Sequence, residues 1–154
     1  MGLFDKIKSF ANQVAGTSAK VTLVVEGTSV KEPIKVKINA VVKDAALPIE
    51  KVYLYVKSIE RIQVPRQSMP GGSDKNPQSL EMSTDVFQKM EFTVSNVQTL
   101  DAGQSYDWTY EFSLPAGAHP SYVGKYSYHE WQFYAGLDAK GNDPDSGWIT
   151  VNLK

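Results

Sequence analysis

The side chains in this chain that could carry out chemistry are few, and their spacing matches no standard catalytic or metal site. His119 and His129 are the two histidines, and a zinc site would need two or three further donors close to one of them. Glu130 follows His129 directly, but neighbouring residues of a strand point to opposite faces. We therefore expect His129 to pack inside the fold rather than to bind a metal.

The densest group of acidic and amide side chains is formed by Asp138, Asn142, Asp143 and Asp145. Carboxylate and amide oxygens are the ligands that calcium prefers. However, Lys140 stands where a calcium loop of the EF-hand type has an Asp or Asn. Asp, Asn and Gly are also the usual residues of tight turns. The cluster predicts a hairpin connection in preference to a calcium site.

The sequence also gives little support for catalysis by a nucleophile or by a pair of carboxylates. The chain has no cysteine, which excludes a thiol nucleophile, a thiolate metal site and a disulfide. It has no G-x-S-x-G elbow of the hydrolase type. Glu111 and Glu130 are candidates for a glycosidase pair, but each lies in an alternating strand pattern where an outward charge is ordinary. We expect a protein that is not an enzyme and that needs no metal or cofactor.

Tyrosines suggest an alternative function. Tyr126, Tyr128 and Tyr134 share one face of a predicted strand, and Tyr53 and Tyr55 share a face of another. Together they could form a platform on which sugar rings stack, so a carbohydrate- or ligand-binding module is the alternative hypothesis. Aromatic residues are also favoured on half-buried sheet surfaces. The hypothesis therefore requires a flat, exposed aromatic face.

The elements that would carry these residues are strands. Hydrophobic residues alternate with polar ones in runs separated by turn residues. The runs cover residues 21–26, 34–42, 52–56, 86–94, 106–114, 122–139 and 149–153. This pattern predicts one all-β domain, residues 17–154, folded as an antiparallel immunoglobulin-like or arrestin-like sandwich of about seven strands. The Pro- and Gly-rich stretch from Pro65 to about Thr84 predicts a long loop.

Residues 1–16 show a different period and predict a short amphipathic helix that ends at Gly16. A candidate interaction face gathers on one side of that helix. It consists of Leu3, Phe4, Ile7, Phe10 and Val14. Such a helix would either cover one end of the sandwich or lie on a membrane or in the groove of a partner protein.

Composition narrows the cellular context. The formal net charge of −1 argues against a nucleic-acid partner, because such binding needs a basic surface that displaces counterions. No apolar run is long enough to cross a bilayer, and charges interrupt the first residues where a signal peptide would be apolar. We expect a cytoplasmic protein, with peripheral membrane contact through the N-terminal helix as an option.

Several short motifs resemble those of the arrestin-like superfamily, which includes bacterial sporulation-control proteins. They are residues 112–115 (FSLP), 121–126 (SYVGKY), 131–138 (WQFYAGLD) and 47–49 (LPI). The resemblance implies a non-enzymatic adaptor or scaffold that binds other proteins or membrane-associated cargo. Members of the superfamily usually pair two sandwiches, whereas this chain has the length of one. Self-association through sheet edges is therefore a further option, giving a homo-oligomer.

Overall fold

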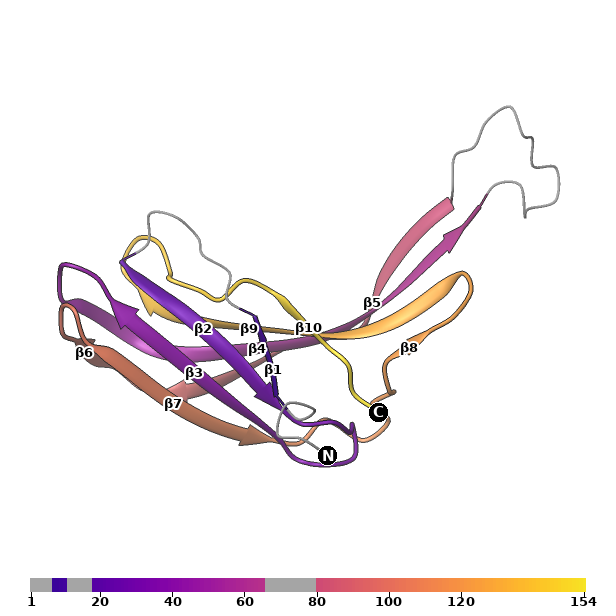
Figure 1. Ribbon diagram of the computed structural model, residues 1–154, viewed down its shortest axis with the longest axis horizontal. Helices are drawn as coiled ribbons and strands as arrows, with labels where there is room; N and C mark the ends of the chain where they lie inside the picture. Colours follow the sequence, from indigo (N-terminus) through magenta and orange to yellow (C-terminus); the bar gives the residue numbers. More distant parts are fainter. Residues whose placement is uncertain (1–6, 11–17, 66–79) are drawn as a thin grey trace.

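The computed structural model describes residues 7–10, 18–65 and 80–154, which form two antiparallel sheets packed face to face (Figure 1). The first sheet has the order β1–β2–β3–β7. Its strands are β1 (Ile7–Phe10), β2 (Ala19–Glu26), β3 (Ile34–Val42) and β7 (Ser105–Phe112).

The second sheet has the order β10–β9–β4–β5, with β6 paired to β4 and β8 paired to β9. Its strands are β4 (Leu47–Val64), β5 (Leu80–Ser95), β6 (Gln98–Leu100), β8 (Tyr122–Val123), β9 (Ser127–Ala139) and β10 (Ile149–Val151). Within the described ranges all regular structure is strand, and no helix there is long and apolar enough to span a bilayer. The predicted all-β antiparallel fold is confirmed.

Strict two-residue alternation builds the core between the sheets. In β3, the side chains of Ile34, Val36, Ile38, Ala40 and Val42 are all at most 2% exposed. They face the fully buried β9 side chains of Trp131, Phe133, Ala135 and Leu137. These are the inward positions that the sequence pattern predicts, because side chains of successive strand residues alternate between the two faces.

The predicted N-terminal helix is wrong for the part of it that the structure describes. Residues Ile7–Phe10 form strand β1, which pairs antiparallel with Glu26–Leu23 of β2. Four residues satisfy a helical and a strand pattern almost equally well, and pairing with an existing sheet edge decides between them. The rest of the predicted helix, including Leu3, Phe4 and Val14, lies outside the described residues. The predicted interaction face is therefore not seen as a unit.

Two predicted boundaries also change. Leu80–Thr84 belongs to β5 rather than to a loop, and β4 begins at Leu47, before the predicted run 52–56. The predicted strand 122–139 is divided into β8 and β9 by a tight turn, closed by a hydrogen bond from Gly124 N to Ser127 O of 2.6 Å. Turn residues at Gly124 and Lys125 explain the break.

The two sheets differ in length. Strands β4 and β5 have 18 and 16 residues, whereas β2, β3 and β7 have 8 or 9. Because sheet strands rise about 3.3 Å per residue, β4 and β5 must extend past the end of the first sheet. Figure 1 shows them projecting away from the sandwich. We call this projection, residues Ile59–Val64 and Leu80–Val86, the arm.

Candidate functional site

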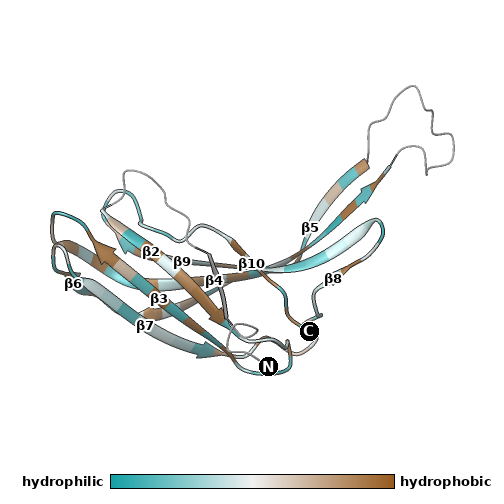
Figure 2. Ribbon diagram, in the orientation of Figure 1, coloured by the Kyte–Doolittle hydropathy of each residue, from teal (hydrophilic) through white to brown (hydrophobic). Residues whose placement is uncertain are grey.

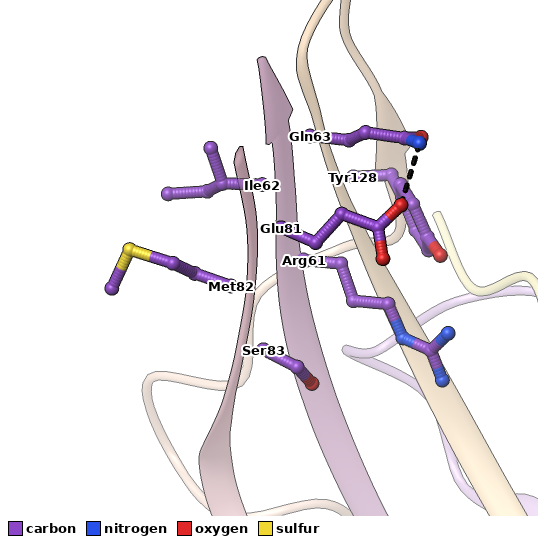
Figure 3. A pocket seen from close by; sticks show the side chains of 7 residues that line it. All are labelled: Arg61, Ile62, Gln63, Glu81, Met82, Ser83 and Tyr128. Carbon is purple, nitrogen blue, oxygen red and sulfur yellow. Dashed lines mark hydrogen bonds between the residues drawn. The ribbon is translucent and has the colours of Figure 1, made fainter. Parts of the chain in front are cut away.

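The arm is a two-stranded ribbon with one apolar and one polar face. Ile62 lies opposite Met82, and Val64 lies opposite Leu80. Directly paired residues share a face of an antiparallel ladder, so these four side chains form one surface. Figure 2 shows hydrophobic and hydrophilic residues following each other along the two strands of the arm. In Figure 3 the polar side chains lie on the opposite side from Ile62 and Met82.

The apolar face of the arm is the continuation of the core-facing side of the second sheet. Alternate residues of β4 carry that side through the sandwich, where Leu54 and Val56 are fully buried. The same series continues through the polar residues Ser58 and Glu60 and reaches Ile62 in the arm, where the first sheet no longer covers it. There Ile62, Leu80 and Met82 are 38%, 47% and 60% exposed. This face of the arm therefore carries apolar side chains like those of the core, but it is exposed to solvent.

Strand β8 extends this surface at its base. Tyr122 pairs with His129 of β9, which in turn pairs with Glu60 of β4. The Tyr122 ring stacks on the His129 ring, with centroids 6.1 Å apart, and its hydroxyl donates a hydrogen bond to the Glu60 carboxylate. That bond raises the pKa of the Tyr122 hydroxyl. A half-exposed tyrosine thus marks where the buried core passes into the arm.

His129 is 3% exposed and packs edge-on against Trp131, which confirms its predicted place inside the fold. Its Nδ1 lies 2.9 Å from the carbonyl oxygen of Pro120, and its Nε2 has no hydrogen-bond partner among the described residues. His119 contributes its backbone carbonyl to the Trp131 indole N–H at 2.8 Å. In the described part of the chain, no three His, Asp or Glu side chains form a group able to hold a metal ion.

The polar face of the arm lines an open hollow of about 390 Å³ (Figure 3). Gln63 Nε2 donates to Glu81 Oε1 at 2.8 Å, and Arg61 lies 3.9 Å from Glu130. The Arg61 guanidinium also lies over the Tyr128 ring, 5.9 Å from its centroid. These groups pair with one another, and exposed ion pairs of this kind contribute little energy. We infer that the role of these polar side chains is to keep this face of the arm exposed to water.

A second cluster, of aromatic rings, lies on the outer face of the second sheet. The rings of Tyr55 and Tyr134 are 5.8 Å apart, and Trp148 lies 5.2 Å from Tyr134. Lysine ammonium groups cover them, with Lys89 Nζ 4.1 Å from the Tyr55 centroid and Lys57 Nζ 4.8 Å from that of Trp148. Cation–π contacts stabilise such stacks.

Tyr53 belongs to this cluster but is almost completely buried. It lies across Gly136, where an added Cβ would approach the Tyr53 hydroxyl oxygen to 2.3 Å. The hydroxyl donates to Asp143 Oδ2 at 3.1 Å, and burial raises its pKa. Burial and the Asp145 carboxylate raise the pKa of Tyr134 to about 12. Tyr53 is therefore not open to a sugar ring, whereas Tyr55 and Tyr134 are partly exposed and their rings are stacked. The carbohydrate- or ligand-binding alternative stays a prediction.

The acidic cluster behaves as a turn. Asp143 Oδ1 accepts the Ala139 N–H at 3.0 Å, and Asp145 Oδ1 accepts the Gly147 N–H at 2.7 Å. Gly141 and Gly147 in the same connection have φ of 95° and 68°, values that glycine adopts without strain. The predicted hairpin connection between β9 and β10 is confirmed.

Sequence reasoning missed the arm. The alternation of Leu80 and Met82 with Glu81 and Ser83 is a strand signal, but it follows a Pro- and Gly-rich stretch and is short of β-branched residues. Its partner Ile62 lies six positions beyond the predicted run 52–56. The pairing register between the two segments brings their apolar residues together on one surface, and neither sequence pattern shows this register by itself.

The two facing antiparallel sheets define a β-sandwich. Among solved structures, the chain is similar to Spo0M, a sporulation control protein from Bacillus subtilis, with a TM-score of 0.61 and 18% sequence identity. The match covers 90% of this chain and 50% of Spo0M, so the chain spans half the length of that protein. The resemblance to sporulation-control proteins is confirmed at the level of the fold. No protein-family model and no curated protein sequence matches the chain.

Proposed function

We propose that this protein is a non-enzymatic adaptor of arrestin-like type that holds a partner protein on the apolar face of its arm. One observation carries the proposal. Nine large hydrophobic side chains are exposed in the described residues, and four of them, Ile62, Leu80, Met82 and Val86, belong to the arm. Grouped exposed apolar side chains mark interaction surfaces more often than scattered ones do.

The partner we propose is a protein segment that presents apolar side chains. Removing apolar surface from water releases about 25 cal/mol per Å², and the arm offers such side chains on two paired strands. The exposed Tyr122 beside it is of the residue type enriched at protein interfaces. The likeness to Spo0M, which is described as a sporulation control protein, also supports this class of function.

Two further features support a non-enzymatic function. The His129 ring is bonded to the Pro120 carbonyl oxygen rather than to a nucleophile. On the arm, Gln63 is paired with Glu81, and Arg61 is paired with Glu130 of β9. We also propose that the protein acts in the cytoplasm, which its cysteine-free sequence supports.

Site-specific crosslinking in cells would test the proposal. A photoreactive phenylalanine derivative replaces Met82 in one variant and Ser83 in the other. These neighbours are both exposed and lie on opposite faces of the arm. We expect a discrete protein adduct from position 82, and at least about tenfold less from position 83, since a 1.4 kcal/mol preference corresponds to tenfold occupancy.

The captured protein is then purified and tested for binding to the full chain and to an Ile62→Ser, Met82→Ser variant. Loss of binding in that variant, with an unchanged melting temperature, supports the proposal. Equal crosslinking from both positions would contradict it. So would flotation of the full chain with lipid vesicles in place of a protein adduct, because the arm would then be a membrane contact.

A further inference from the structure

The two sheets offer four terminal strands to solvent, and these edges differ in length and regularity. Strands β1 and β10 have four and three residues. Strand β5 is long, but its pairing with β4 contains three register shifts. Bulges of this kind twist an edge and block the addition of another strand. Strand β7 pairs with β3 through eight consecutive residues without a shift.

Among the strands that the structure describes, β7 pairs with β3 alone, so the backbone groups on its outer edge have no strand partner there. Val42 N donates to Gln104 O at 2.9 Å, immediately before β7 begins. In an antiparallel ladder the hydrogen-bonded pairs recur every second residue. The even-numbered residues of β7 therefore bond to β3, and Ser105, Asp107, Thr109 and Glu111 direct their N–H and C=O groups to the open side.

The core-facing side chains of β7 are also only partly covered. Its core-facing residues Tyr106, Trp108 and Tyr110 are half-buried, whereas Val36 and Ile38, their neighbours on β3, are at most 1% exposed. Both sets face the same core, so the difference comes from the missing neighbour on the open side of β7. A further strand there would bury the three rings.

Charge identifies the kind of strand that fits. Asp107 and Glu111 lie on the outer face of β7, and within the described residues Glu111 makes no ion pair. Two copies of β7 pairing about Thr109 would place Asp107 opposite Glu111, and like charges directly opposite each other destabilise a sheet. A strand with lysine or arginine at the outward positions would instead place opposite charges side by side.

We propose that the open edge of β7 binds an extended peptide segment in which apolar and basic residues alternate, and that this segment adds to the first sheet as a fifth strand. Main-chain bonds to the odd-numbered residues of β7 provide affinity, and Asp107 and Glu111 select the basic side chains. The edge is a different surface from the arm, so this inference does not depend on the proposed function.

Strand β3 supplies the probe, because its sequence already has the required alternation and pairs with β7 on the other side. A synthetic peptide of residues Ile34–Val42 is added to the full chain. Its matched control carries Glu in place of Lys35 and Lys37. Amide hydrogen exchange is followed by NMR. We expect protection of the Asp107 and Thr109 amides by the basic peptide, and binding weaker by about tenfold for the acidic one.

Two variants of the protein complete the test. An Asp107→Lys, Glu111→Lys variant should reverse the preference and bind the acidic peptide better. Thr109→Pro removes an outward N–H, a change that edge strands tolerate, and should abolish binding of both. The inference is overturned if neither peptide protects β7, if protection falls on β5 or the arm, or if both proteins bind both peptides equally. The charge-reversal variant decides the question if Thr109→Pro fails to fold.

Discussion

The sandwich and the arm are built from the same strands, yet they place the same kinds of side chain in opposite environments. Along β4, Leu54 and Val56 have no exposed surface, whereas Ile62, further along the same face, is 38% exposed. Apolar side chains occupy the same alternate positions in both regions, with the polar residues Ser58 and Glu60 between them. The difference is that the first sheet covers one region and ends before the other. Sequence periodicity therefore determines which face of the sheet a side chain lies on. The extent of the opposing sheet determines whether that side chain is buried.

The largest effect should come from removing a ring that both sheets enclose. Trp131→Ala deletes a fully buried side chain that packs on Phe87 and His129. We expect a loss of about 3–5 kcal/mol in the free energy of unfolding, measured by urea titration. A loss below about 1 kcal/mol would show that the sandwich is no better packed than the arm.

Gly136→Ala should be the next most disruptive change. The new Cβ would meet the hydroxyl oxygen of Tyr53 at 2.3 Å, and such overpacking costs about 1–3 kcal/mol. Combining it with Tyr53→Ala removes the clash, so the double variant should be more stable than the sum of the two single losses predicts. Strictly additive losses would contradict the close approach.

Alkaline pH should weaken the sandwich through its tyrosines. The pKa of Tyr134 is raised from 10.0 to about 12 in the folded protein, so the stability linked to its neutral form is fully present below pH 10. That stability is lost as the pH rises through 12. Urea titrations between pH 9 and 12 should show a smaller decline for Tyr134→Phe than for the unchanged protein. Identical declines would show that Tyr134 does not contribute to the loss of stability at high pH.

The smallest effect on stability should come from the arm. Met82 is 60% exposed, so Met82→Ser should change the free energy of unfolding by less than about 0.5 kcal/mol. Its effect should appear in partner binding instead. A loss of more than about 1 kcal/mol in the same urea assay would mean that the arm belongs to the folded core, and the contrast between the regions would disappear.

Much of the sandwich could be predicted from the sequence because each buried strand carries its own alternation. The inward series of β3, β4 and β9 are correct, and so is the packed position of His129. Register is the information that a single sequence lacks. The pairing of Ile62 with Met82 crosses 20 positions, and the pairing of Ile7 with Glu26 crosses 19. The arm and the position of β1 depend on such pairings, and both were missed.

The order of strand pairing has a kinetic consequence. Strands β4 and β5 follow each other in the chain, but β3 must find β7 across a separation such as the 68 positions between Asn39 and Asp107. Long closures slow folding, so the β4–β5 hairpin should form before the first sheet is complete. Pulse-labelling hydrogen exchange should then protect the amides of β4 and β5 earlier than those of β7. On a ribosome, β4 and β5 would leave the exit tunnel before β7, so the arm would be presented ahead of the sandwich that supports it.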